Sequence, residues 1–144
     1  MIKFFKILLA IVLCFIFHYS IVFSSDEKVK IGLLVPMTGD NKNLGQLLIK
    51  STRLALEDID KKQIEIYPKD TASNPNQTLK SAFEFKQEGI KIVIGPVFYD
   101  NLIYLKEVEE IIFLSLTNKT INLPKNVIST GVNSTSQLNT IKKF

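Results

Sequence analysis

The run from residue 28 to residue 39, Lys-Val-Lys-Ile-Gly-Leu-Leu-Val-Pro-Met-Thr-Gly, constrains the fold more than any other part of the chain. It is a nearly continuous apolar segment of strand length that stops at Pro36 and turns at Thr38 and Gly39. Such runs are typical of strands buried on both faces of a parallel sheet. A long helical pattern follows at once, so the turn is expected at the carboxyl edge of that sheet, where open α/β sheets bind ligands.

Strand-like and helix-like patterns alternate along the rest of the chain. Strands are expected at 28–36, 64–67, 90–94, 111–116 and 126–130, and helices at 43–59, 75–88, 100–110 and 134–144. Pro68 is expected to end the second strand, while Asn74 caps the second helix and Gly89 terminates it. This alternation predicts the α/β class, with a doubly wound parallel sheet and right-handed crossovers.

The first two helical patterns each carry a stripe that is expected to face the core. In the first helix the stripe consists of Leu44, Leu47, Leu48, Ser51, Ala55 and Ile59, and in the second it consists of Leu79, Ala82, Phe83 and Lys86. Either Asp40 or Asn41 is expected to cap the first helix.

The N-terminus has the three parts of an export signal. Lys3 and Lys6 precede an apolar run at 7–17, and a more polar stretch ends in small residues. Residues 1–24 are therefore expected to be a signal peptide cleaved after Ser24, and the protein is expected in the periplasm, touching the membrane only through this signal. The alternative is an uncleaved anchor, although the apolar run is shorter than the ~20 residues that span a bilayer.

Composition excludes several classes of function. The single cysteine, Cys14, and the single histidine, His18, both lie in the expected signal. The remaining chain therefore cannot use a cysteine nucleophile, a Ser-His dyad or a histidine-ligated metal. We expect no catalytic residues, no metal site and no cofactor. Two of the 18 basic residues also lie in the signal, which leaves a net charge of +2 against 14 acidic residues, too small to indicate a nucleic-acid partner.

Four local patterns, in this order and spacing, resemble the type I periplasmic binding proteins, most of all the leucine/isoleucine/valine-binding branch. They are residues 31–39 with Leu44-Gly45-Gln46, residues 69–75, residues 88–97, and Phe113-Leu114-Ser115 with Thr117-Asn118. The resemblance covers the N-terminal lobe of a two-lobed fold, which assigns residues 28–144 to a truncated first lobe. The chain ends inside its last helical pattern, which favours a fragment of a longer protein.

The resemblance implies an extracytoplasmic solute-binding protein of an ABC transporter, whose partners are the permease and a branched-chain amino acid or related small polar ligand. The alternative is an activator of a penicillin-binding protein in peptidoglycan synthesis, because Pro68–Thr71 and Gly95–Phe98 are similar to that branch. An enzyme using Asp40 and Asp70 as an acid pair is a third hypothesis, which the lack of histidine and cysteine disfavours.

The candidate ligand-binding residues lie in three loops at the carboxyl edge. They are Thr38 and Gly39, then Tyr99, Asp100 and Asn101, and finally Ser115, Thr117 and Asn118. In the family's amino-acid binders, hydroxyl and backbone N–H groups of such loops hold the ligand carboxylate, and Thr117 matches the family's threonine there.

Each of these loops also has a purely structural interpretation. Thr117 and Asn118 are ordinary turn residues, and Tyr99 either stacks on a ring or sugar or covers the sheet edge. The family is expected to have small hydroxyl residues in this loop, so Tyr99-Asp100-Asn101 departs from its pattern. Asp100 would repel a ligand carboxylate at ~4 Å by about 1 kcal/mol in water. Its alternative role is that of a helix cap.

Overall fold

The structure is a computed structural model that describes residues 28–59 and 63–142. The expected signal peptide, residues 1–24, lies outside the described residues. In chain order the elements are β1 (Val29–Val35), α2 (Lys42–Glu57), β2 (Ile64–Asp70), α3 (Pro75–Gln87), β3 (Ile92–Ile94), the 3₁₀ segments η1 (Tyr99–Leu102) and η2 (Leu105–Glu107), β4 (Ile112–Ser115), β5 (Val127–Ser129) and α4 (Ser134–Ile141).

The five strands form one parallel sheet in the order β2-β1-β3-β4-β5. Strand β1 pairs with β2 along its whole length, from Val29 opposite Ile64 to Val35 opposite Asp70. On its other side β1 pairs with β3. The predicted α/β class and the parallel sheet are confirmed.

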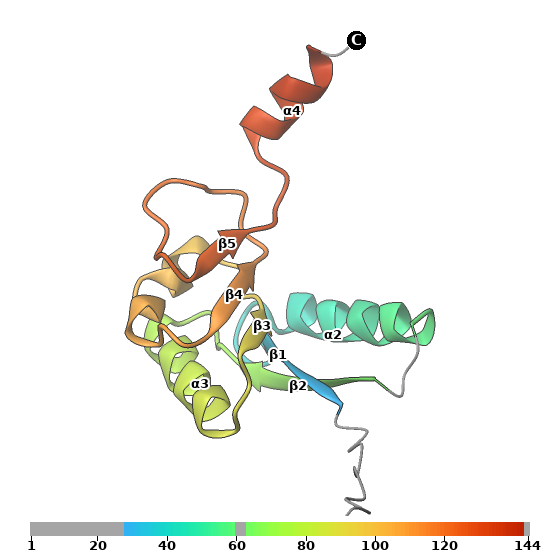
Figure 1. The fold of residues 1–144 in the computed structure, drawn as a ribbon, viewed down its shortest axis with the longest axis vertical. Helices are drawn as coiled ribbons and strands as arrows, with labels where there is room; N and C mark the ends of the chain where they lie inside the picture. The colour runs from blue at the N-terminus through green and yellow to red at the C-terminus, as the bar shows by residue number, and fades with distance from the viewer. Residues whose placement is uncertain (1–27, 60–62, 143–144) are drawn as a thin grey trace, which may run out of the picture.

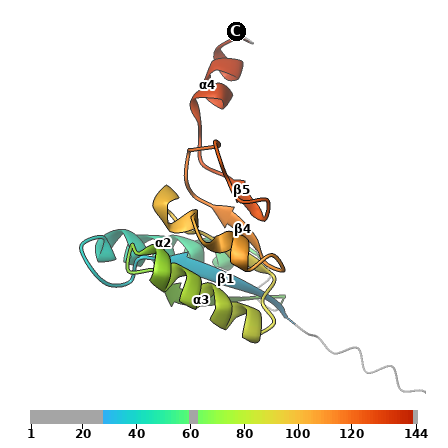
Figure 2. The ribbon, with the colours of Figure 1, turned by 90° about the vertical axis from the view of Figure 1, so that its left-hand side faces the viewer.

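Helices α2 and α3 lie on opposite sides of the sheet, with β1 between them in Figure 2. The chain leaves β1 toward β2, and then crosses back over β1 to reach β3. The strand order therefore reverses between β1 and β3, which is the position where open α/β sheets form a ligand crevice.

The main core lies between the sheet and helix α3. It contains Phe85 of α3, Leu34 of β1, Val93 of β3 and Phe113 of β4, all fully buried. Leu105 of η2 closes the same cluster. This core holds the strands whose carboxyl ends carry the candidate site.

Two predicted elements differ from the structure. Strand β2 continues through Pro68, which pairs opposite Leu33, and ends at Asp70. Proline is tolerated there because β2 is an edge strand and its free side needs no N–H donor. The helix expected at 100–110 is instead the two short 3₁₀ segments η1 and η2, separated by a turn.

The buried faces of both helices are rotated relative to the prediction. In α2 the buried position is Gly45, whereas Leu44 and Leu47 of the predicted stripe are 38% and 65% exposed. In α3 the buried residues are Thr78, Ser81, Ala82 and Phe85, while Phe83 and Lys86 face solvent. The predicted caps of α3 are confirmed, because Asn74 Oδ1 accepts the N–H groups of Asn76 and Gln77 and Gly89 has a φ of 74°.

Close approach of two backbones explains the rotation of α2. A methyl group at Gly45 would lie 1.8 Å from the carbonyl oxygen of Pro36, so only glycine allows α2 to start against the end of β1. A residue with a larger side chain at this position would push the helix away from the sheet. The side of α2 that faces the sheet is therefore set by this contact and not by the periodicity of its leucines.

Part of the sheet face on the α2 side is open. Ile92 of β3 lies opposite Ile112 of β4, and Ile128 of β5 lies opposite Leu114 of β4. The three isoleucines are 39%, 48% and 53% exposed. Helix α4 does not cover them, because it projects from the end of β5 away from the sheet (Figure 1).

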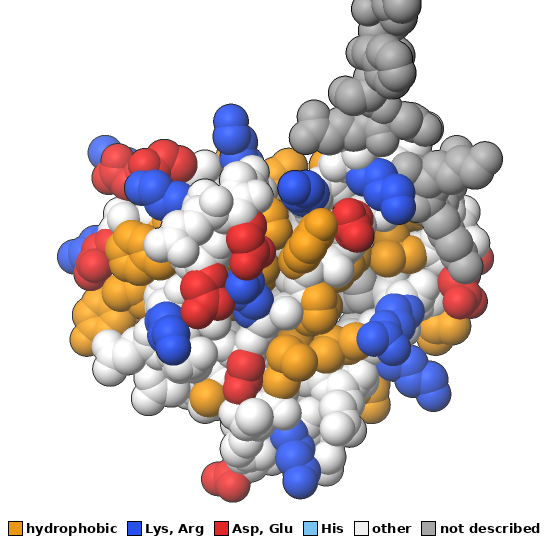
Figure 3. Space-filling view, turned by 90° about the horizontal axis from the view of Figure 1, so that it is seen from below, with side chains coloured by type: hydrophobic (Ala, Val, Ile, Leu, Met, Phe, Trp, Pro, Cys, Tyr) orange, Lys and Arg blue, Asp and Glu red, His pale blue; other side chains and the backbone are white. Residues whose placement is uncertain are grey.

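Charges of both signs are mixed on one face of the molecule. On the face seen in Figure 3, acidic and basic side chains alternate around exposed hydrophobic side chains, without a large patch of one sign. This face therefore has no electrostatic footprint for nucleic acid.

We predict that Gly45→Ala destabilises the fold, although alanine is the better helix former. The clash with Pro36 is expected to lower the free energy of unfolding by about 2–3 kcal/mol. Urea unfolding followed by circular dichroism measures it, with Gln46→Ala at the exposed neighbouring position as the control. Equal stability of the Gly45→Ala protein and the control would contradict the contact between α2 and β1.

Candidate functional site

The loops at the carboxyl ends of the strands form the candidate site. Loop one (residues 36–41) follows β1, loop two (71–74) follows β2, loop three (95–98) follows β3, and loop four (116–126) follows β4. All strands are parallel, so these loops gather at one edge of the sheet. The predicted site residues lie at this edge or immediately after it.

Asp70, the last residue of β2, dominates loop one. Its Oδ1 accepts the N–H groups of Met37 at 2.7 Å, Thr38 at 3.2 Å and Ala72 at 2.8 Å. Its Oδ2 accepts the hydroxyl of Thr38 at 2.5 Å. The hydrogen-bond donors that Thr38 could offer a ligand are therefore engaged with a carboxylate of the chain itself.

These hydrogen bonds also set the ionisation of Asp70. Burial alone would raise the pKa of this carboxyl, but the bonds from the Thr38 hydroxyl and from the N–H groups of Ala72, Met37 and Thr38 together outweigh it. The pKa of Asp70 is consequently lower than its ordinary value, because the donors stabilise the charged form.

Loop four is held by hydroxyl groups. The buried Ser115 hydroxyl donates to the carbonyl oxygen of Pro96 at 2.9 Å and accepts the N–H of Thr117 at 3.3 Å. The Thr117 hydroxyl accepts the N–H of Lys119 at 3.3 Å, and Ser129 of β5 donates to the Thr117 carbonyl at 2.6 Å. Ser115 and Thr117 thus link loops three and four to β5.

A hollow of about 480 Å³ opens between loops three and four. It is lined by Val97, Phe98, Tyr99, Asp100, Leu116, Thr117, Asn118, Lys119, Gly131 and Val132. Four predicted site residues, Tyr99, Asp100, Thr117 and Asn118, therefore share one hollow. Thr38, Gly39, Asn101 and Ser115 do not line it, and the ligand-binding role of all eight stays a prediction.

The charged groups of this hollow come from Asp100 and Lys119. The Lys119 ammonium lies 4.6 Å from the centre of the Tyr99 ring, and the Tyr99 hydroxyl donates to the carbonyl oxygen of Ile121 at 2.9 Å. Lys119 was missed by the sequence analysis, although it directly follows the Thr117-Asn118 pair. Asp100 does not cap η1, whose N-cap is Phe98.

Asn101 is placed inside the fold. It is 1% exposed, and neither atom of its side-chain amide has a hydrogen-bond partner among the described residues. A buried amide without partners costs free energy. The burial of Asn101 was not predicted, because Asn101 was assigned to a candidate ligand-binding loop at the sheet edge.

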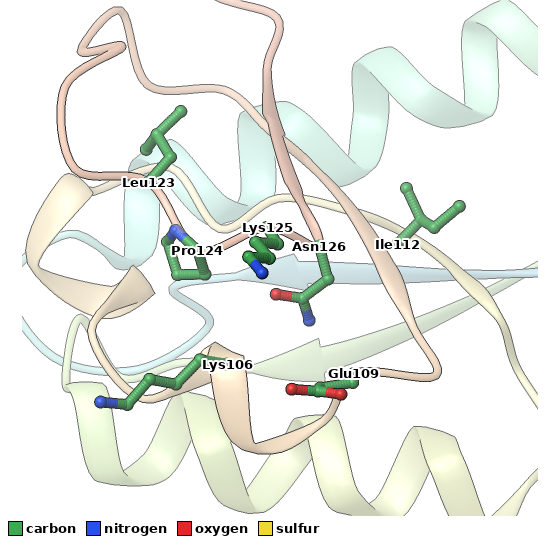
Figure 4. A pocket seen from close by; sticks show the side chains of 7 residues that line it. All are labelled: Lys106, Glu109, Ile112, Leu123, Pro124, Lys125 and Asn126. Atoms are coloured by element: carbon green, nitrogen blue, oxygen red, sulfur yellow. The ribbon is translucent and has the colours of Figure 1, made fainter.

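A second hollow, of about 660 Å³, lies between η2 and the residues that directly precede β5 (Figure 4). Its lining includes Lys106, Glu109, Ile112 and Asn126. The Asn126 amide donates to the carbonyl oxygens of Leu105, Val108 and Ile111 at 2.9–3.2 Å, so the central polar group ties η2 to the sheet. This hollow is larger than the first, but it lies away from the switch point. The Asn126 amide at its centre is already hydrogen-bonded within the chain.

Within residues 28–59 and 63–142, no cluster of histidine, cysteine or carboxylate side chains is arranged to hold a metal ion. None of the helices in these two ranges combines the length and the hydropathy that crossing a bilayer requires.

Comparison with known proteins identifies the fold. The family described as periplasmic binding protein matches residues 28–142. A search of curated proteins gives no match. Among solved structures, the C-domain of LpoA from Haemophilus influenzae, a regulator of PBP1A, is 27% identical over 72% of this chain and 32% of its own, with a TM-score of 0.58.

Two solute-binding proteins share the fold at lower identity. LivJ of Streptococcus pneumoniae, a branched-chain amino acid transporter substrate binding protein in complex with isoleucine, is 20% identical over 71% of this chain and 33% of its own (TM-score 0.60). A solute binding protein of Rhodopseudomonas palustris in complex with 4-hydroxybenzoate is 20% identical over 63% and 27% (TM-score 0.58). The chain spans about a third or less of the length of these structures.

We predict that acid removes the contribution of Asp70 to stability. Its pKa in the folded chain is lower than the value of about 3.9 in an unfolded chain, so its contribution is complete above about pH 4 and is lost as the pH falls through the folded pKa. Urea unfolding from pH 7 to pH 2.5 should show the stability difference between the native chain and Asp70→Asn shrinking in acid.

Asp40→Asn serves as the control for this titration, since Asp40 lies in the same loop without a hydrogen bond to its side chain in the described structure. The account of loop one is wrong if the difference between the native chain and Asp70→Asn is the same at both ends of the pH range.

Proposed function

The chain belongs to the periplasmic binding protein family, and from this premise we propose that it acts by contact with a partner protein, as an activator of a penicillin-binding protein in peptidoglycan synthesis. The contact surface of this proposal is the carboxyl edge of the sheet, with the half-buried Tyr99 and the exposed Asn118 and Lys119 around the hollow. We place the protein in the periplasm, to which the expected signal peptide at 1–24 would direct it.

The observation that carries this proposal is the engagement of the edge donors. A free amino acid presents a carboxylate, which needs several N–H or O–H donors. In this chain Asp70 takes the donors of loop one, and the Ser115 and Thr117 hydroxyls take N–H groups of loop four. Asp100 adds a negative charge to the hollow, which disfavours a ligand carboxylate, and the Lys119 ammonium over the Tyr99 ring adds a positive charge to the same hollow.

Identity supports the same choice. The LpoA C-domain, described as a regulator of PBP1A, is 27% identical to this chain, whereas the isoleucine complex of LivJ is 20% identical. The segments Pro68–Thr71 and Gly95–Phe98, which resemble the activator branch, lie at the ends of β2 and β3 on this edge.

A second candidate function is solute binding for an ABC transporter, with a branched-chain amino acid or a related small polar molecule as ligand. It is favoured by the hollow itself, which gathers Tyr99, Asp100, Thr117 and Asn118. A small ligand is normally buried by most of its surface, and one lobe supplies contacts from one side only. This candidate therefore requires a second lobe, and with it the permease as partner.

We predict direct binding between this chain and a purified penicillin-binding protein of the same organism, measured by biolayer interferometry. Asn118→Arg places a bulky cation at the rim of the hollow and is expected to weaken binding by about tenfold or more. Lys80→Glu, on an exposed turn of α3, is the matched control and should bind like the native chain.

Isothermal calorimetry of the same preparation with leucine and isoleucine separates the two candidates. The activator proposal expects no heat of binding for either amino acid. It fails if an amino acid binds this chain and no penicillin-binding protein does.

A further inference from the structure

Loop one and Asp70 have the geometry of an anion site that is already occupied. The N–H groups of two successive residues, Met37 and Thr38, point at one carboxylate, as in the backbone concavities that bind anions. The Thr38 hydroxyl and the N–H of Ala72 complete a set of four donors around the same group, at 2.5–3.2 Å. We name these four donors the loop-one cradle.

Three of the four donors lie in loop one and are fixed by another part of the fold than the carboxylate, while the Ala72 N–H lies two residues after Asp70. The backbone of Asp70 is paired with Val35 in the sheet, and its carbonyl oxygen accepts the hydroxyl of Ser81 from α3 at 2.8 Å. Loop one is fixed at its far end by the start of α2, where the Asn41 amide donates to the Ser73 hydroxyl at 3.0 Å. The cradle is therefore preformed from both sides, and the carboxylate closes it.

Backbone strain lies beside the cradle. Ala72 and Ser73 have φ values of 46° and 54°, a left-handed conformation that residues with a Cβ rarely adopt. Such a conformation persists only where surrounding contacts determine it. The bond from Ala72 N–H to Asp70 and the bond from Asn41 to Ser73 are two of those contacts.

We propose that the loop-one cradle is a carboxylate-binding site that the chain fills with its own Asp70, and that removal of this side chain opens the site to a small carboxylate from solution. Asp70 is then a positioning residue that joins loops one and two into one rigid rim next to the switch point. The proposal concerns this chain alone and is independent of the proposed partner.

Chemical rescue of Asp70→Ala by formate tests the proposal, because formate has the size of the missing carboxylate group. Residue-resolved amide hydrogen exchange is measured by NMR on the native chain, Asp70→Ala and Asp40→Ala, in sodium formate and in sodium chloride at equal ionic strength. In chloride, the Met37 and Thr38 amides of Asp70→Ala should exchange faster than in the native chain by on the order of tenfold.

Formate should restore the protection of these two amides in Asp70→Ala with a saturable dependence on concentration. Amides in the middle of β1, the native chain and Asp40→Ala should not respond to formate beyond the response to chloride. The proposal is overturned if formate and chloride act alike on Asp70→Ala, or if its Met37 and Thr38 amides exchange as slowly as in the native chain.

Asp70→Asn keeps the test decisive if Asp70→Ala does not fold. Its side-chain amide retains one oxygen and fills the same space, but it lacks the charge that the four donors stabilise. Faster exchange of the Met37 and Thr38 amides without rescue by formate is expected, since the site stays filled. Exchange as slow as in the native chain would show that the cradle does not select a carboxylate and would refute the proposal.

Discussion

The central constraint on this structure is that β1 is paired on both sides. Strand β2 lies along one edge of β1 and β3 lies along the other, so the chain must leave β1 over one face and return over the opposite face. The reversal of strand order places the end of β1 at the switch point. The contact between Gly45 and Pro36 holds α2 against this end, and the Asp70 carboxylate ties the end of β2 to the same loop. The geometry of the carboxyl edge follows from these contacts.

The architecture could be predicted because it depends on features that repeat along the sequence. Strand-length apolar runs alternate with helical patterns, and the Asn74-Pro75 cap and Gly89 mark the limits of α3. What the periodicity could not reveal was the buried face of each helix. Gly45 decides the orientation of α2 through a backbone contact with Pro36, and a glycine contributes nothing to an apolar stripe. Tertiary pairing likewise carried β2 past Pro68, because an edge strand has one side that needs no donor.

The candidate site was predictable in part, for a similar reason. Loops after parallel strands gather at one edge, so Tyr99, Asp100, Thr117 and Asn118 could be placed together from their positions in the chain. The hydrogen bonds made by the site residues could not be predicted from the sequence. The engagement of Thr38 by Asp70 spans 32 residues of sequence, and the burial of Asn101 depends on a segment that forms two 3₁₀ turns instead of a helix. Lys119 escaped notice because its contact with the Tyr99 ring joins two loops that only the sheet brings together.

The family and the chemistry of the candidate site can indicate different functions. In this chain the choice between solute binding and partner binding depends on which hydrogen-bond donors are free at the sheet edge. The fold is shared with solute-binding proteins, but in this lobe the donors of loop one are bonded to Asp70, and the N–H groups of Thr117 and Lys119 in loop four are bonded to hydroxyls of the chain itself. The most direct test is a titration of the ¹⁵N-labelled chain with an unlabelled penicillin-binding protein, followed by amide chemical shifts. The account predicts that the shifts concentrate around the hollow, at Tyr99 at the start of η1 and at Asn118 and Lys119 in loop four. Shifts confined to α2 and the open face of β3–β5, or shifts in loops three and four caused by isoleucine alone, would contradict it.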